Sequence, residues 1–161
     1  MSSAGAQTTT PKALWCAGIR VTPLPCAGRV MAMELVHPPG IPGPPPHYHE
    51  DCAEFFYVTA GAVGVLNGDE WVALGPGECC EVPRGVLHTF RNDGEGDARM
   101  ITGFEPAGFE AFFEEFGVDA QEPGAREAST SPETMQRLVE GCGRFGMIVP
   151  PEVLQQIAGS E

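Results

Sequence analysis

The chain has 161 residues, 42% of them hydrophobic, and its 9 basic and 22 acidic residues give a formal net charge of −13. This length is enough for one domain with a buried core. The strong negative charge excludes nucleic acid and anionic membrane surfaces as partners, because both require a basic patch. No apolar run reaches the roughly 18 residues of a membrane span, so we predict no membrane insertion.

The N-terminal segment and the cysteines indicate a cytoplasmic protein. Residues 1–12 lack the basic stretch and the apolar segment of a signal peptide, and we expect a flexible lead-in there. The six cysteines form no C-x-x-C pair, and the adjacent Cys79 and Cys80 cannot easily bridge each other. Reduced thiols are the simpler prediction, and they are typical of the cytoplasm.

Residues 13–104 divide into short segments of strand character. These are residues 13–17, 29–36, 54–60, 62–66, 71–74, 78–82, 87–91 and 98–104. Asn67-Gly68 separates two of them and predicts a tight hairpin, because Asn-Gly accepts the positive φ of a type I′ turn. Many short strands with turn signals between them predict an all-β sandwich or barrel.

Residues 105–161 predict a short α-helical extension that packs on the barrel. Four phenylalanines at helical spacing predict a first helix of about 11 residues that ends at Gly117. They are Phe109, Phe112, Phe113 and Phe116. We expect this aromatic face to pack against the sheet rather than to line a ligand site. Ser131-Pro132 starts a second helix that runs to about residue 140, and Pro150-Pro151 starts a third. Residues 118–130 are predicted to form a loop.

Three of the four histidines, together with one glutamate, have the pattern of a metal site. His47 and His49 point to the same face of an extended segment, because side chains alternate along a strand. Glu54 begins the next apolar segment and can reach the same point, and His88 is the remaining histidine in a suitable context. Such a set suits one divalent transition metal ion: Fe, Ni, Mn, Co, Cu or Zn. It leaves positions open for water, dioxygen or a substrate oxygen.

The spacing of these residues resembles the two motifs of the cupin superfamily. The first motif, G(x)5HxH(x)3-4E(x)6G, is met by His47, His49, Glu54 and Gly61, although Ile41 and Pro42 lie where its first glycine belongs. The second motif, G(x)5PxG(x)2H(x)3N, is met at every position by Gly77, Pro83, Gly85, His88 and Asn92. The resemblance implies a double-stranded β-helix, or jelly-roll barrel, over residues 13–104. It also implies that His47, His49, Glu54 and His88 are the metal ligands.

A finer resemblance covers the run VPRGVLHTFRNDGEGDARMITGFEPAGFEAFFEEFG. This run is similar to small single-domain cupins of the bacterial quercetin 2,3-dioxygenase type. The resemblance implies a dioxygenase that acts on a small aromatic or enolic metabolite, with Glu54 as metal ligand and general base. It also implies a homodimer.

Two other functions remain open, and the same ligands would serve the first of them. One is a metal-dependent isomerase, cyclase or lyase, and the other is a cupin that binds a small molecule without chemistry. Phe56 and Val58 share the face of Glu54, and Phe90 follows His88 by two residues, so all three are candidates for the substrate pocket.

Four further residues have simpler interpretations than a role in the site. Cys52 is not needed as a ligand, because the set is complete without it. His37 is expected to be a loop histidine rather than a fifth ligand. Arg84 and Arg91 flank His88, and we expect surface salt bridges for them rather than contacts with a substrate.

Overall fold

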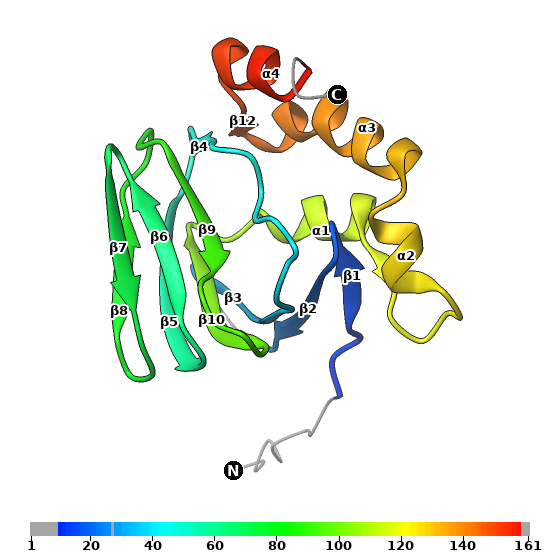
Figure 1. Ribbon diagram of the computed structural model, residues 1–161, viewed down its shortest axis with the longest axis horizontal. Coiled ribbons are helices and arrows are strands. Elements are labelled where there is room, and N and C mark those ends of the chain that lie inside the picture. Colours follow the sequence, from blue (N-terminus) through cyan, green and yellow to red (C-terminus); the bar gives the residue numbers. More distant parts are fainter. Residues whose placement is uncertain (1–9, 27, 159–161) are drawn as a thin grey trace, which may run out of the picture.

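The computed structural model describes residues 10–26 and 28–158 (Figure 1). Antiparallel strands form two layers, and short helices follow them in the chain. The expected lead-in, residues 1–12, lies mostly outside the described residues. Within the described ranges, no helix is long and apolar enough to cross a membrane.

The larger sheet has seven strands and carries Glu54. Its strands, in spatial order, are β11 (Val118–Asp119), β1 (Leu14–Cys16), β2 (Ile19–Leu24), β3 (Met31–His37), β10 (Ala98–Glu105), β5 (Ala53–Ala60) and β8 (Cys79–Val82). In β5, the buried residues Glu54, Phe56 and Val58 alternate with less buried ones. Alternate side chains of a strand point to one face, so this strand turns its buried residues toward the space between the layers.

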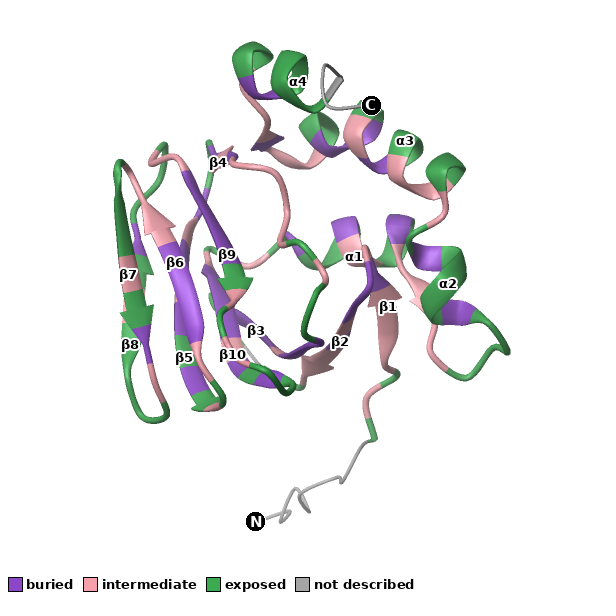
Figure 2. Cartoon of the chain, in the orientation of Figure 1, coloured by how far each residue is buried: buried purple, intermediate pink, exposed green. Residues whose placement is uncertain are grey.

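The second layer carries His49 and His88. It consists of β7 (Glu70–Leu74), β6 (Val63–Asn67) and β9 (His88–Asn92), with β4 (Tyr48–His49) and β12 (Met147–Ile148) forming a separate pair. An antiparallel bridge between His47 and His88 joins the two parts through backbone hydrogen bonds of 3.0 and 2.8 Å. Figure 2 shows buried residues along β5, β6 and β9. The two layers enclose one hydrophobic core and form a jelly-roll barrel.

The hairpin predicted at Asn67-Gly68 joins β6 and β7, but its turn differs from the prediction. Asn67 pairs with Glu70, so Gly68 and Asp69 are the two central residues. Gly68 has a φ of 70°, whereas the only described non-glycine residue with a positive φ is Ala17. A positive φ at the first central residue alone is typical of a type II′ turn rather than type I′.

The eight strand segments predicted from the sequence correspond to β1, β3 and the strands β5 to β10, and the extended HxH segment is confirmed as β4. The prediction missed β2, which contains Pro23. A proline within an apolar run argues against a strand, because its nitrogen carries no hydrogen to donate to a neighbouring strand.

The C-terminal extension contains the three predicted helices: α1 (Glu110–Phe116), α3 (Pro132–Gly141) and α4 (Pro151–Ala158). Ser131 caps α3 by accepting a hydrogen bond of 3.3 Å from the backbone nitrogen of Thr134. The predicted loop over residues 118–130 is wrong, because this segment contains β11 and α2 (Ala125–Ser129). A 3-10 helix, η1 (Cys142–Phe145), leads into β12. Helices α1 and α2 contact β1, which places the extension against the barrel (Figure 1).

Candidate metal centre

Four buried side chains converge at one point inside the barrel. His47, His49, Glu54 and His88 each offer one ligand atom, and these atoms all lie within 4.8 Å of one another. Each of the four residues is at most 5% exposed. The structure therefore brings together all four residues that the sequence predicted as metal ligands.

The backbone explains why these side chains meet. His47 and His88 are directly opposite in an antiparallel bridge, and directly opposite side chains lie on the same face. His49 lies two residues after His47 and therefore on that face as well. Glu54 reaches the cluster from β5 in the other layer, where it is paired with Phe104 of β10.

Hydrogen bonds to the backbone fix two of the imidazoles. The Nδ1 atoms of His47 and His88 lie 2.8 Å from the oxygen of Pro45 and 2.9 Å from the oxygen of Val86. A carbonyl oxygen only accepts, so both Nδ1 atoms carry the hydrogen. The Nε2 atoms are then free to bind a metal, which is the usual arrangement of histidine ligands.

The Nε2 atoms of His49 and His88 face the Glu54 carboxylate. Oε2 of Glu54 lies 2.9 Å from Nε2 of His88 and 3.3 Å from Nε2 of His49. A nitrogen lone pair on Nε2 of His88 would repel the Glu54 carboxylate at 2.9 Å. A proton or a cation must therefore lie between these two atoms. Either a proton on His88 or a metal cation in the cluster satisfies this requirement.

The pKa shifts agree with this picture. Burial lowers the pKa of His47 to about 3, and the neighbouring His88 and His49 act in the same direction. Burial by itself raises the pKa of Glu54, but hydrogen bonds from His49 and His88 outweigh it and lower this pKa to about 2. Burial also lowers the pKa of His88, but Glu54 outweighs burial there and raises it. The carboxylate is thus ionised at neutral pH, as a metal ligand must be.

The donor set fits a divalent transition metal ion. Three imidazole nitrogens and one carboxylate oxygen suit such ions, and the shared buried position removes competing water. The Nδ1 atom of His49 is buried and has no hydrogen-bond partner among the described residues. The ring of His49 is instead held edge-on by Phe104 and Phe109, at centroid distances of 5.4 and 4.6 Å.

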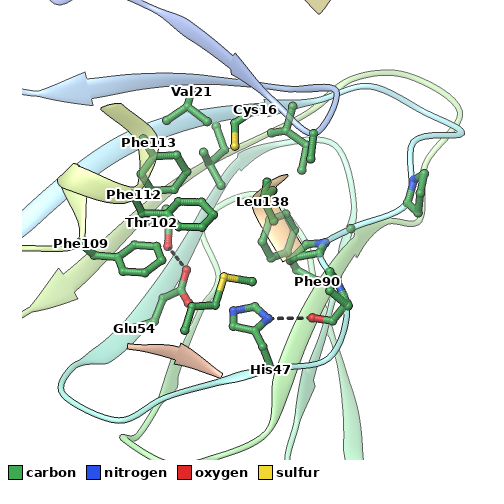
Figure 3. A pocket seen from close by; sticks show the side chains of 18 of the residues that line it. Cys16, Val21, His47, Glu54, Phe90, Thr102, Phe109, Phe112, Phe113 and Leu138 are labelled. Carbon is green, nitrogen blue, oxygen red and sulfur yellow. Dashed lines mark hydrogen bonds between the residues drawn. The ribbon is translucent and has the colours of Figure 1, made fainter. Parts of the chain in front are cut away.

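A cavity of about 360 Å³ opens directly beside the cluster (Figure 3). His47, His49 and Glu54 form one part of its wall. The remaining wall is mainly apolar and comes from the barrel strands, the proline-rich loop 41–45 and the C-terminal extension. No lysine or arginine is among the described residues that line it. Apolar walls around a few convergent polar groups are typical of a small-molecule site.

All four candidate ligand residues fall within a segment that matches a known family model. Residues 33–104 match the model described as a cupin domain. Residues 33–104 form a cupin domain.

Two curated proteins are similar to parts of this chain. Protein SchB of Streptomyces halstedii is 44% identical over 55 residues, which are 34% of this chain and 40% of that protein. Quercetin 2,3-dioxygenase of Bacillus subtilis is 32% identical over 71 residues, which are 44% of this chain and 21% of that protein. The match therefore spans less than half the length of either curated relative.

Solved structures support the cupin fold. An RmlC-like cupin from Shewanella frigidimarina superposes with a TM-score of 0.54 and 19% sequence identity. The superposition covers 66% of this chain and 93% of that one. At this identity the likeness establishes the fold and leaves the reaction open.

The cavity is completed by residues outside the cupin domain. The aromatic face belongs to the hydrophobic core, as expected, but Phe109, Phe112 and Phe113 also line the cavity, which was not expected. Leu138 of α3 and Met147 of β12 also line it. A helical pattern identifies which face is buried, but it does not tell whether that face meets atoms or a cavity.

The three predicted pocket residues lie at different places. Phe90 lines the cavity, and its ring is 5.6 Å from that of His37. Phe56 and Val58 are completely buried in the core of the cupin domain, and they are not among the described residues that line the cavity. A contact between these two residues and a substrate stays a prediction.

The mouth of the cavity is marked by the exposed residues of its lining. Pro42, in the loop before the HxH motif, and Thr130, between α2 and α3, both line the cavity and are exposed to solvent. Gly18 of the β1–β2 turn lies between their two segments, because a Cβ atom on it would come within 3.0 Å of Thr130 and 3.1 Å of Ile41. The cavity thus opens between the proline-rich loop and the α2–α3 connection. The proline run of the sequence was a signal for this rigid wall.

Cys52, His37 and the two arginines near His88 lie outside the cluster of candidate ligands. Cys52 is buried and outside the ligand cluster, and burial, followed by the nearby carboxylates, raises its pKa to about 11. His37 is the last residue of β3 and is completely buried, so its expected place in a loop is wrong. Arg84 and Arg91 form surface ion pairs with Glu105 and Asp93, as expected.

Proposed function

We propose that this protein is a metal-dependent oxygenase that acts on a small aromatic or enolic metabolite, such as a flavonol-like compound. The observation that carries the proposal is the direct opening of a buried three-histidine, one-carboxylate cluster onto an apolar cavity of about 360 Å³. The similarity of 71 residues to a quercetin 2,3-dioxygenase supports the same reaction class.

In this function, His47, His49, Glu54 and His88 hold the metal ion. When bound, the ion supplies a positive centre with open positions that accept oxygen ligands and stabilise developing negative charge. The two backbone carbonyls that bind His47 and His88 keep those rings turned toward the centre. Such partners maintain the orientation of a ligand during turnover.

Glu54 is the general base of the proposed reaction. Its carboxylate lines the cavity and is ionised at neutral pH, so it accepts the acidic hydroxyl proton of a phenol or enol. A pKa of about 2 makes it a weak base, and the proton transfer is favourable only when the substrate oxyanion is stabilised as it forms. A metal ion held by the four side chains would supply this stabilisation.

The cavity selects the substrate and excludes water. The rings of Phe90, Phe109 and Phe112 lie along its wall, where they can pack against a flat ring (Figure 3). Because no lysine or arginine is among the described lining residues, an uncharged substrate is favoured over a phosphate or a carboxylate.

The proposal is tested first by metal content and then by oxygen uptake. Mass spectrometry of the purified protein is expected to find a near-stoichiometric transition metal that the His49→Ala variant loses. An oxygen electrode then screens flavonols and related enols. Consumption of oxygen together with substrate supports the proposal.

Two results contradict it. Conversion of a substrate without oxygen uptake indicates an isomerase, cyclase or lyase instead. A protein that takes up no metal even after reconstitution, but binds an aromatic ligand, indicates a binding protein without chemistry.

A further inference from the structure

Thr102 is a buried polar residue beside the cluster that metal binding by itself does not explain. It lies on β10, is 1% exposed and lines the cavity. Its hydroxyl oxygen is 2.9 Å from Oε1 of Glu54 (Figure 3). The same oxygen is 2.8 Å from the backbone oxygen of Phe55. A threonine hydroxyl has one hydrogen, so it donates to one of these two acceptors at a time.

The two oxygens of Glu54 have separate partners. Oε2 faces Nε2 of His49 and of His88, at 3.3 and 2.9 Å, whereas Oε1 faces Thr102. A terminal carboxylate rotates broadly about its last torsion, so it has no fixed orientation of its own. The contact with Thr102 selects the orientation in which Oε2 points to the imidazoles.

The location of Thr102 suits this task. Residue 102 is paired with Phe56 across the β5–β10 ladder, which makes Glu54 its diagonal neighbour on the same face. A β-branched side chain in a strand has few χ1 rotamers, so its hydroxyl oxygen stays close to the carboxylate. The hydrogen bond is buried, and a buried bond to a charged acceptor is stronger than one in water.

We propose that Thr102 is a positioning residue for Glu54 and thereby sets the affinity of the cluster for a divalent metal ion. The proposal rests on the metal binding assumed in the proposed function, but not on the reaction with dioxygen. Replacement of partners that orient a metal ligand typically weakens metal binding about 10- to 100-fold.

The experiment compares Thr102→Val, which keeps the shape and removes the hydroxyl, with Thr102→Ser, which keeps the hydroxyl. Competition with a metallochromic indicator gives the Kd of the metal-free protein for Zn²⁺ and Co²⁺. We expect the Kd of Thr102→Val to rise at least about tenfold and that of Thr102→Ser to stay within roughly threefold. The visible absorption spectrum of the Co²⁺ form reports ligand geometry, and it is expected to change only in the valine variant.

The matched control is Thr59→Val. Thr59 donates a hydrogen bond to the backbone oxygen of Arg99, and so links the same two strands away from the cluster. Its removal is expected to leave the metal Kd unchanged. If Thr102→Val does not fold, as judged by circular dichroism, Thr102→Ala replaces it as the hydroxyl-free variant.

The outcomes separate this proposal from the proposed function. An unchanged Kd in the hydroxyl-free variant, an equal loss in Thr102→Ser, or an equal loss in Thr59→Val overturns the role of Thr102. A wild-type protein with no measurable affinity for either ion overturns the role of Thr102 and the metal-dependent function together. The expected changes in Kd without oxygen uptake by any substrate overturn the oxygenase alone.

Discussion

Phe109 is a residue of the C-terminal extension that packs against the candidate metal centre. Its ring stacks on Phe112 with centroids 4.9 Å apart, and it contacts the rings of Phe104 and His49 at 4.7 and 4.6 Å. The substitution Phe109→Ala removes all of these contacts at once. We therefore expect it to lower the free energy of unfolding substantially, although it changes no ligand.

The magnitude follows from the surroundings of the ring. Truncation of a buried phenylalanine to alanine costs about 3–5 kcal/mol, and each aromatic pair contributes about 0.5–1.5 kcal/mol within that range. Phe109 also lines the cavity, so part of its ring has no packing partner to lose. We therefore expect a loss near the lower limit, about 3 kcal/mol. In a chain of this size, the melting temperature is then expected to fall by roughly 6–12 °C.

Urea denaturation of the metal-free protein, followed by circular dichroism, measures this loss. Tyr57→Ala is the matched control, because Tyr57 is an aromatic residue on β5 whose side chain is 42% exposed. The control is expected to cost less than about 1 kcal/mol. A loss below about 1 kcal/mol in Phe109→Ala would refute the reasoning, since it would mean that the ring is not packed as the contacts indicate.

Three more predictions concern protons, the ligand set and the mouth of the cavity. Burial lowers the pKa of His47 to about 3 in the folded protein. As the pH falls below about 6.5, this imidazole is therefore protonated in the unfolded chain but not in the folded one. His47 is thus expected to contribute a loss of about 1.7 kcal/mol of stability to the metal-free protein between pH 6.5 and pH 5, measured by urea titration at each pH. In Glu54→Gln, the pKa of His88 is expected to fall, because Glu54 is what raises it; NMR titration measures this pKa. Thr130→Trp places a large ring at the mouth and is expected to slow ligand association about tenfold by stopped-flow fluorescence.

Each of these predictions has a contradicting result. Constant stability between pH 6.5 and pH 5 would mean that His47 is not buried as a neutral imidazole. An unchanged pKa of His88 in Glu54→Gln would separate these two side chains. If Thr130→Trp binds ligand as fast as Thr130→Ser, the ligand enters elsewhere.

The cluster was predictable from sequence because its signals are local. His47 and His49 share a face through the period of two along a strand, and the turn residues around His88 fix where its strand begins. The same alternation identified most strands of the barrel. Alternation does not tell, however, whether a buried side chain reaches the cavity. Phe56 shares the face of Glu54, yet it lies in the core and does not line the cavity.

The elements that the sequence did not predict depend on distant partners. The two-residue strand β12 exists because Met147 and Ile148 pair with His49 and Tyr48, and two residues carry no periodicity of their own. Helix α2 has the sequence AREAS, in which no apolar stripe is visible, although Ala125 and Ser129 are buried. Tertiary contacts decide such segments, and local propensity does not.

The pairing of β4 with β12 has a consequence for the order of events during synthesis. The strand that carries His49 is made long before the strand that completes it, which follows about 100 residues later. At elongation rates of about 5–20 residues per second, the ligand strand lacks this neighbour for roughly 5–20 s. The β4–β12 pair therefore forms only after the C-terminal extension has been made, and ribosome-bound fragments ending before Met147 are expected to bind a metal ion poorly.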